Sequence, residues 1–443
     1  MNLAGPLIFS IFLLIIGNYF PKNSINVAIF LFILFIGSTL LILGNSTFPF
    51  NIERVSLFVC IGAMLKNWKY FKERMRFLFS FPGFRLIILY TLYIGFVSYS
   101  DNFKFYFFSF LPSILVPIIL PALFLIKKEK YYSLFNILFL CLLLHCLAVI
   151  LNYYDIFSVP KILEATFVQE YEGELKNQSK YFMRSGYFRV NGISAGVISE
   201  SYYLATLSVL SMMYLFNLKT LIFSFIVLVS IIFTGTRTAI FGYFIGIVLF
   251  ITLNNFQSAG LKAFYPFIKK SLILLILISF IILPSLKNIV DIDQIVNNIY
   301  ISTFLMEGEG SIEAKVLRLP IALDLFFSKP IFGYNISPKA VYMDLMNSGD
   351  LPTPFIMLLS GGIALFMIWL LFFLQMVFDI YKERKNNYLS NIDYNYYNIS
   401  IVMISIGFLT QFSHHEESHI PILIMVYIST IIWSNFNESN IKI

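Results

Sequence analysis

Charged residues are scarce in this sequence. Asp, Glu, Lys and Arg make up only 12% of its 443 residues, whereas ordinary soluble domains contain about 25%. Hydrophobic residues make up 58% of the chain. Apolar runs of roughly 18 or more residues, each long enough to cross a bilayer, recur from end to end. We therefore predict an all-α, polytopic integral membrane protein.

Cysteine is also scarce, with three residues in all, Cys60, Cys141 and Cys146. All three lie inside apolar runs without metal-ligand spacing, so we expect no disulfide framework. The first twenty residues have no Lys or Arg before the apolar run and no small-residue cleavage site, so we expect no secretory signal there. The net charge of +7 is spread among loops, which fits orientation in a membrane and does not indicate nucleic-acid binding.

The apolar runs predict about 12 or 13 spans. The third run, 52–65, is short and opens with Glu53 and Arg54, so both readings of it stay open. The predicted ranges are 3–20, 25–43, 52–65, 84–99, 103–126, 131–153, 199–217, 219–235, 237–253, 271–286, 353–378, 396–412 and 420–435.

Four short basic clusters predict the orientation, because loops rich in Lys and Arg stay in the cytoplasm. From the second cluster onward they occupy alternate connections, so all four can lie inside. The N-terminus is then inside if the third span is absent and outside if it is present. The clusters are Lys66, Lys69, Lys72, Arg74 and Arg76; Lys127, Lys128 and Lys130; Lys262, Lys269 and Lys270; and Lys382, Arg384 and Lys385.

This orientation places two long loops on the outer side, residues 154–199 and 287–352. Structureless loops longer than about 15 residues are uncommon unless they are functional. The transmembrane helices then fall into an N-terminal group, 1–153, a central group, 200–286, and a C-terminal group, 353–443.

Arg237 lies in TGTRTAIFG, between two spans with almost no connector. Anchoring on the cytoplasmic side is the usual role of such a residue, but the basic clusters place this turn outside. An Arg kept there suggests an anionic partner. Arg184 and Arg189 lie just before a span, in MRSGYFRVNG. Both fit ordinary loop charges, but the Gly, Ser and Asn around Arg189 favour a turn that exposes backbone N–H groups to an anion.

The second outer loop carries further candidates. Arg318 lies in KVLRLPIALDLF, which fits either a binding site or an amphipathic helix on the bilayer surface. Lys329, before Pro330, offers a point charge to a phosphate. Asp344 and Asp350 precede the long span at 353; either carboxylate can accept a proton from a sugar hydroxyl, or simply pair with a nearby Lys.

The segment HEESH, from His415 and Glu416 to His419, fits the HExxH pattern of zinc proteases. On a helix the two His would share a face, with Glu416 as base. However, Pro421 predicts that a helix starts here and does not run through the motif, and no further His or Asp follows as a third ligand. We favour a polar cap on the last hairpin, or a role in sugar binding or acceptor activation.

Three motifs occur in a fixed order within residues 184–370: FRVNG, TGTRTAIFG, and RLPIALDLFFSKPIFGYN followed by PFIMLLSGGIALF. With many spans and two outer loops, this order resembles the O-antigen polymerase and O-antigen ligase superfamily of bacterial envelope polysaccharide synthesis. The resemblance implies a helical glycosyltransferase of the GT-C type in the inner membrane, with its site facing the periplasm. It further implies that Arg189, Arg237 and Arg318 hold the lipid diphosphate or the growing glycan.

By the same resemblance, the substrate is an oligosaccharide on undecaprenyl diphosphate, a chain-length regulator and a flippase are membrane partners, and neither cofactor nor metal is needed. One departure matters. Ligases of this superfamily typically carry a His-Asn pair just before the span that follows the second loop, and here Pro352 and Thr353 stand there. This favours the polymerase and leaves the general base open among Asp344, Asp350, His415 and Glu416.

We therefore predict a polymerase that joins lipid-linked repeat units. The alternatives are a ligase that transfers glycan to a lipid A core, a lipid-linked glycan transporter and an HExxH zinc protease. A transporter predicts paired discontinuous spans and ionisable residues near the midplane, whereas the predicted spans are nearly free of charge.

Overall fold

The structure is a computed structural model that describes most of the chain. The described residues are 4–35, 40–43, 50–99, 106, 110–125, 128–154, 168–169, 183–184, 187–188, 190, 192–193, 197–214, 218–255, 312–341, 345, 351–386, 391–412 and 419–441. The predicted span 271–286 lies outside these ranges.

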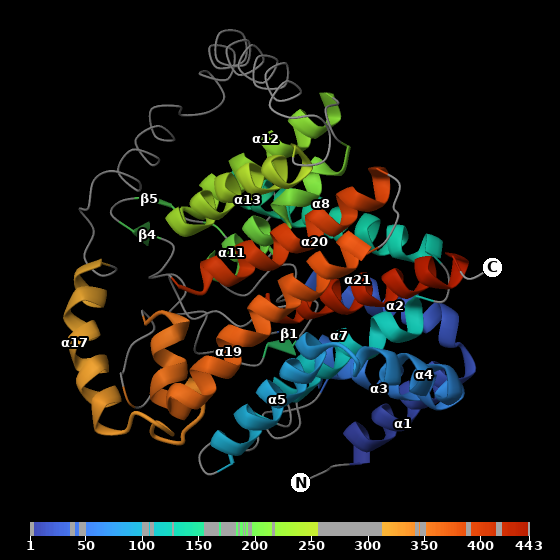
Figure 1. The fold of residues 1–443 in the computed structure, drawn as a ribbon, viewed down its shortest axis with the longest axis horizontal. Helices are drawn as coiled ribbons and strands as arrows, with labels where there is room; N and C mark the ends of the chain where they lie inside the picture. Colours follow the sequence, from blue (N-terminus) through green and yellow to red (C-terminus); the bar gives the residue numbers. More distant parts are fainter. Residues whose placement is uncertain are drawn as a thin grey trace.

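The described elements are almost all helices (Figure 1). A 3₁₀ helix, η2 (Ser208–Tyr214), continues α11. The α-helices are α1 (Ala4–Tyr19), α2 (Pro21–Phe35), α3 (Ile52–Lys66), α4 (Trp68–Leu78), α5 (Pro82–Val97), α7 (Leu111–Phe124), α8 (Lys128–Tyr153), α11 (Val197–Leu207), α12 (Leu218–Thr234), α13 (Arg237–Asn255), α17 (Ile312–Ser328), α18 (Pro338–Ala340), α19 (Thr353–Asn386), α20 (Asn391–Thr410) and α21 (Ile420–Ile441).

Long apolar helices confirm the prediction of a helical protein built for a membrane. Within the described ranges, two helices are long and apolar enough to cross a bilayer, Glu129–Tyr153 and Thr353–Lys385. The number becomes four if each of two bent pairs is one span: α1 with α2, bent by 119°, and α4 with α5, bent by 101°. The count of about 12 spans stays a prediction.

The third predicted run is a helix, α3, and it packs against both α1 and α2. Its contact with α1 is made backbone to backbone. A Cβ on Gly17 would lie 2.1 Å from the Val59 carbonyl oxygen, and a Cβ on Gly62 would lie 2.2 Å from that of Leu14. Small residues at such crossings let membrane helices approach closely, so this packing depends on both glycines.

The prediction of a span reaching Leu43 is wrong at its C-terminal end. Helix α2 ends at Phe35, and Leu40–Leu43 form strand β1. β1 pairs antiparallel with β2 (Phe50–Asn51) and with β3 (Val168–Gln169) from the first long loop. A glycine, which often ends helices, stands at position 37. A second hairpin, β4 (Met183–Arg184) with β5 (Tyr187–Phe188), lies in the same long loop.

The packing falls into two hydrophobic clusters. The large one joins α1–α5, α7, α8, α11–α13 and α19–α21. The small one joins α17 and α18 to the first part of α19 through Ala322, Val341, Leu351, Ile356 and Leu359. The described part of the second long loop, from α17 to α18, therefore packs on the first part of α19.

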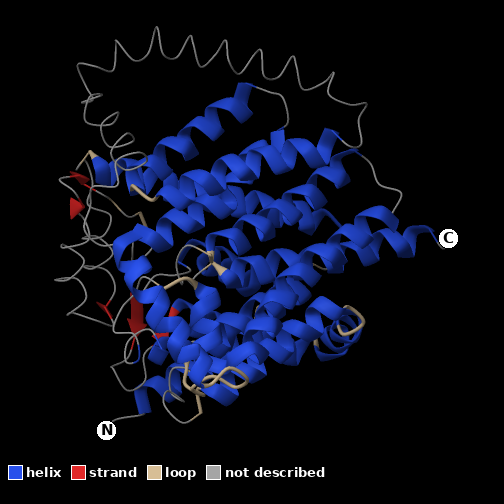
Figure 2. Ribbon diagram, turned by 60° about the vertical axis from the view of Figure 1, so that its left-hand side comes forward, coloured by secondary structure: helices blue, strands red, loops and turns tan. Residues whose placement is uncertain are grey.

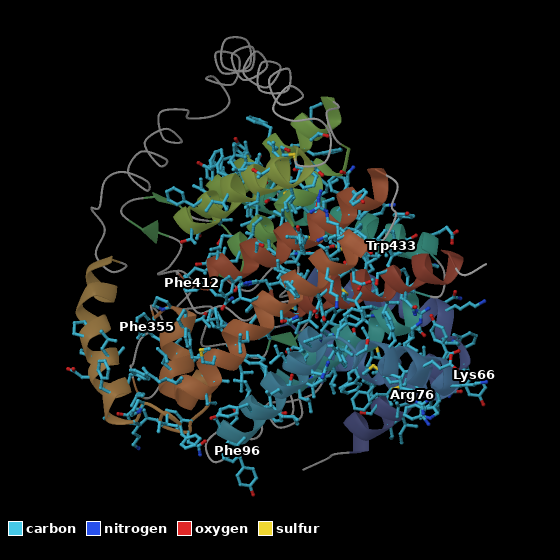
Figure 3. All side chains as sticks on the ribbon, viewed as in Figure 1. Lys66, Arg76, Phe96, Phe355, Phe412 and Trp433 are labelled. Atoms are coloured by element: carbon cyan, nitrogen blue, oxygen red, sulfur yellow. The ribbon has the colours of Figure 1, made fainter. Side chains whose placement is uncertain are left out.

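The two ends of the bundle differ. Figure 3 shows Lys66 and Arg76 at one end, which we call the basic end, and Phe355 and Phe412 at the other, which we call the loop end. Figure 2 shows the strands gathered at the edge opposite the C-terminus, which lies at the basic end. Hydrogen bonds link three of the basic segments to neighbouring parts of the chain there. Tyr70 Oη donates to the Leu125 carbonyl oxygen and Arg384 Nη2 to that of Leu253, while Asp379 accepts from Gly83 N.

Candidate functional site at the loop end

Two arginine-bearing segments meet at the loop end. The backbone N–H of Val190, which follows Arg189, donates to the Phe233 carbonyl oxygen over 3.3 Å. The Phe233 ring stacks on Tyr153 at the end of α8, with ring centroids 3.8 Å apart. The FRVNG segment is thus attached to the end of α12, just before the turn that leads to Arg237. The fold brings together the two motifs that the sequence singled out first.

The α12–α13 turn is tight because Gly235 has a φ of 62° and donates its N–H to the Ile232 carbonyl oxygen. Thr236 is buried, and its carbonyl oxygen accepts from Ala239 N in the first turn of α13. Arg237 is therefore the first residue of α13. The partial positive charge of a helix N-terminus disfavours a cation there, so this placement is consistent with an anionic ligand.

A buried ionisable pair lies close to the FRVNG segment. His145 Nδ1 and Glu200 Oε1 are 2.7 Å apart, and both side chains have no exposed surface. His145 Nε2 contacts the Leu34 carbonyl oxygen at 2.9 Å. His145 precedes the end of α8 by eight residues, which is about 12 Å along the helix axis. Ionisable residues at membrane depth are candidates for function by default.

Gly192 of the FRVNG motif rests directly on this pair. A Cβ at this position would lie 2.6 Å from Glu200 Oε1 and 3.1 Å from the His145 carbonyl oxygen. Gly192 therefore packs against α8 at His145, and Val190, two residues earlier, is bonded to Phe233. Irregular backbone at membrane depth is tolerated only where protein buries it or where it lines a cavity.

A second polar group lies beside the first along α11. Thr353 Oγ1 donates to Gln411 Oε1, and Gln411 Nε2 is 3.0 Å from His419 Nε2. The His419 ring meets the Tyr202 ring edge-on, with centroids 6.0 Å apart. Thr353, at the start of α19, thus presents a buried hydroxyl bonded to the Gln411 amide.

The RLPIALDLFFSKPIFGYN and PFIMLLSGGIALF motifs are also joined. Helix α19 is interrupted at Gly361 and Gly362, where the backbone is not helical. Residues 330–336 fill the interruption. Tyr334 N and Asn335 N donate to the Leu359 and Ser360 carbonyl oxygens at 2.8 and 2.9 Å.

The bonding at this interruption also runs in the other direction, because Ile363 N donates to the Pro330 carbonyl oxygen at 2.9 Å. Gly333 and Gly362 both have positive φ, 59° and 67°, and neither has room for a Cβ. The two glycines thus allow residues 330–336 and the break in α19 to bond closely to each other, and we call this arrangement the interlocked element.

The remaining predicted site residues lie on other elements or outside the described residues. Arg184 pairs with Tyr187 across the β4–β5 hairpin. Arg318 lies within α17, two residues before Pro320. Lys329 is exposed, with Nζ 4.6 Å from the centroid of the Tyr334 ring. Arg189, Asp344, Asp350, His415 and Glu416 lie outside the described residues.

His419, the last residue of HEESH, comes directly before α21, which begins at Ile420. This confirms that a helix starts at this point. Among the described residues, no three His, Cys, Asp or Glu side chains gather as potential metal ligands.

Sequence reasoning missed His145 and Glu200. A usable signal existed, because each is the only residue of the Asp, Glu, Lys, Arg and His types within its predicted span, 131–153 or 199–217. Isolated ionisable residues within membrane spans usually pair with one another. That they pair with each other is a tertiary fact, since α8 and α11 are separated by the first long loop.

Fold and composition together define this chain as a helical protein suited to a membrane, with the described strands and the buried His145–Glu200 pair at its loop end. Comparison with protein-family models and with curated proteins finds no match to this chain.

Proposed function

We propose that this protein is a GT-C-like, multi-pass glycosyltransferase of the bacterial inner membrane, with about 12 spans, that polymerises a surface polysaccharide. Its loop end would face the periplasm and its basic end the cytoplasm, in keeping with the positive-inside rule. The substrates would be oligosaccharide repeat units on undecaprenyl diphosphate. The observation that carries this proposal is the Val190–Phe233 hydrogen bond, which joins the Arg189 and Arg237 segments at the loop end.

In the proposed reaction, a sugar hydroxyl of one lipid-linked unit attacks the anomeric carbon of the chain on another. The new glycosidic bond forms as the bond to the diphosphate breaks, and the hydroxyl proton passes to a base. The departing diphosphate needs charge stabilisation more than protonation, and bidentate Arg suits that task. Removing one donor of this kind typically costs about 2.7–4 kcal/mol of transition-state stabilisation.

A transporter of lipid-linked glycans is the second candidate, and the interruption in α19 favours it, because discontinuous helices line transport sites. At this interruption, however, the freed backbone groups bond to residues 330–336 of the same chain. A substrate would have to displace those bonds. The polymerase therefore remains the better-supported reading.

A deletion strain tests the proposal through its surface polysaccharide on a gel. We expect core capped by one repeat unit, without a long ladder. The intact protein should restore the ladder, whereas Arg189→Ala, Arg237→Ala and Arg318→Ala should not. Arg76→Ala is the matched control, because this exposed cation lies at the basic end.

Other outcomes of the same gel point elsewhere. Core without any repeat, with lipid-linked polymer accumulating, would indicate the ligase. An unchanged ladder would exclude both enzymes and leave the transporter and the protease. Full complementation by all three variants at normal protein level would mean that the Arg site is wrong even if the family is right.

A further inference from the structure

The His145–Glu200 pair connects three parts of the loop end. His145 belongs to α8, Glu200 lies in the first turn of α11, and the Leu34 carbonyl oxygen belongs to the last turn of α2. Tyr203, one residue beyond Tyr202 on α11, stacks on the His145 ring with centroids 4.0 Å apart, and its hydroxyl donates to the Ile33 carbonyl oxygen. One imidazole thus ties together the ends of α2 and α11.

The hydrogen-bond partners determine how many protons the pair holds. A carbonyl oxygen only accepts, so His145 Nε2 carries a proton toward Leu34. The 2.7 Å contact between Nδ1 and Oε1 then needs one further proton between the two atoms. The pair is an imidazolium with a carboxylate, or an imidazole with a carboxylic acid.

Two helix ends lie next to the pair. The imidazole lies at the C-terminal end of α2, where a positive charge is stabilised, and Glu200 lies in the N-terminal turn of α11, where a negative charge is stabilised. Each partner therefore sits at the helix end that suits its charge. A buried pair with this support holds a fixed geometry.

That geometry supports the FRVNG segment. Gly192 lies against Glu200 Oε1 and the His145 carbonyl oxygen with no space for a side chain, and Val190 is bonded to Phe233. Arg189 directly precedes the first of these two anchors. The FRVNG segment is therefore held at two described residues, Val190 and Gly192, which closely follow Arg189 in the sequence. A displacement of about 1 Å at a reacting site can cost 10²-fold in rate.

We propose that His145 and Glu200 are positioning residues that fix the FRVNG segment and thereby hold Arg189 at the lipid diphosphate. This inference rests on the proposed polymerase function. The pair is not itself the base, because Nδ1 and Oε1 face each other and neither side chain reaches the surface. The pair contributes to the reaction only by fixing the position of the segment that contains Arg189.

Glu200→Gln and Glu200→Ala separate position from proton transfer. A Gln amide can donate to a neutral His145 Nδ1 and keeps the shape on which Gly192 rests, whereas Ala removes both. We expect Glu200→Gln to keep kcat/KM within about threefold of the intact protein, and Glu200→Ala and His145→Ala to lower it about 10- to 100-fold.

The assay uses the purified full chain in phospholipid vesicles. Its probe is the undecaprenyl-diphosphate-linked oligosaccharide extracted from the deletion strain. Gly192→Ala retains both His145 and Glu200 but places a methyl group 2.6 Å from Glu200 Oε1, and we expect a similar loss from it. The matched control is Gly242→Ala, where a Cβ would meet nothing closer than Ile406 Cγ2 at 3.3 Å.

Combination with Arg189→Ala shows whether the pair acts through Arg189. We expect Glu200→Ala with Arg189→Ala to be no slower than Arg189→Ala alone, because a misplaced arginine and a missing one are equivalent. A merely structural role would multiply the two losses.

Several results would overturn the inference. Glu200→Gln as inactive as Glu200→Ala, at equal protein level, would indicate proton transfer. Multiplied losses in the double variant, or full activity of Glu200→Ala and Gly192→Ala, would refute positioning while the polymerase proposal stands. Absence of polymer from the intact protein would refute the polymerase proposal, and this inference with it.

Discussion

Two carboxylates at opposite ends of the bundle are similarly buried but have different partners. Asp379, at the basic end, is 3% exposed, and Glu200, at the loop end, is not exposed at all. Asp379 Oδ2 accepts from Gly83 N at 2.9 Å and from Tyr427 Oη at 2.7 Å, and Oδ1 accepts from Gln375 Nε2 at 2.8 Å. It thereby caps the start of α5, as carboxylates do at helix N-termini.

Glu200 has a different environment. Its partner is a second ionisable group, His145, and the segment resting on it is an irregular loop instead of a regular helix. Asp379 accepts hydrogen bonds from neutral donors at the start of a helix, and a contribution to stability is enough to explain this arrangement. The His145–Glu200 pair joins three helices and, in addition, supports irregular backbone at Gly192.

The largest effect should come from Gly362→Val at the loop end. A Cβ there would lie 2.2 Å from the Ile331 carbonyl oxygen, and φ is 67°. The strain of such a backbone costs about 1–3 kcal/mol for a side chain other than Gly, and the clash adds to it. We expect loss of the docked 330–336 segment, a lower melting temperature in detergent and loss of activity. Normal melting and activity would show that the interlocked element is dispensable.

Asp379→Asn should have an intermediate effect, confined to stability. The amide nitrogen must face one of three donors, which leaves that donor without an acceptor and costs about 1–2 kcal/mol. We expect a lower melting temperature and less protein per cell, but unchanged kcat/KM for the protein that is folded. A fall in kcat/KM equal to that of Glu200→Ala would break the distinction between the two ends.

Lys329→Ala should have the smallest effect. Its ammonium group is exposed and lies over the Tyr334 ring, a contact worth about 0.5–1 kcal/mol at the surface. We expect activity to fall by about threefold, with Lys329→Arg as the control that keeps the charge. A loss as large as that of Arg237→Ala would instead make Lys329 a full partner in diphosphate binding.

Much of the helical framework follows from the apolar runs alone. The predicted spans 219–235 and 237–253 match α12 (Leu218–Thr234) and α13 (Arg237–Asn255) closely, because glycine at position 235 marks the turn between two continuous runs. The helix start at Pro421 was equally readable, since proline fits the first turn of a helix.

Features that depend on contacts across the chain were not readable from local sequence. The LLIL of β1 is as apolar as any helix, and only its pairing with Val168 and Asn51 makes it a strand. The two glycines in α19 predict a weak point, but not that residues 330–336 bond into it. The His145–Glu200 pair likewise forms between segments separated by the first long loop.

The most direct test of the account is polymer formation by the purified protein in vesicles that contain extracted lipid-linked repeat units. The intact protein should produce a ladder of chains, and Arg237→Ala, at the same melting temperature, should produce at least about 100-fold less, as removal of one charge-stabilising donor predicts. No ladder from the intact protein, or an equal ladder from Arg237→Ala, would contradict the account.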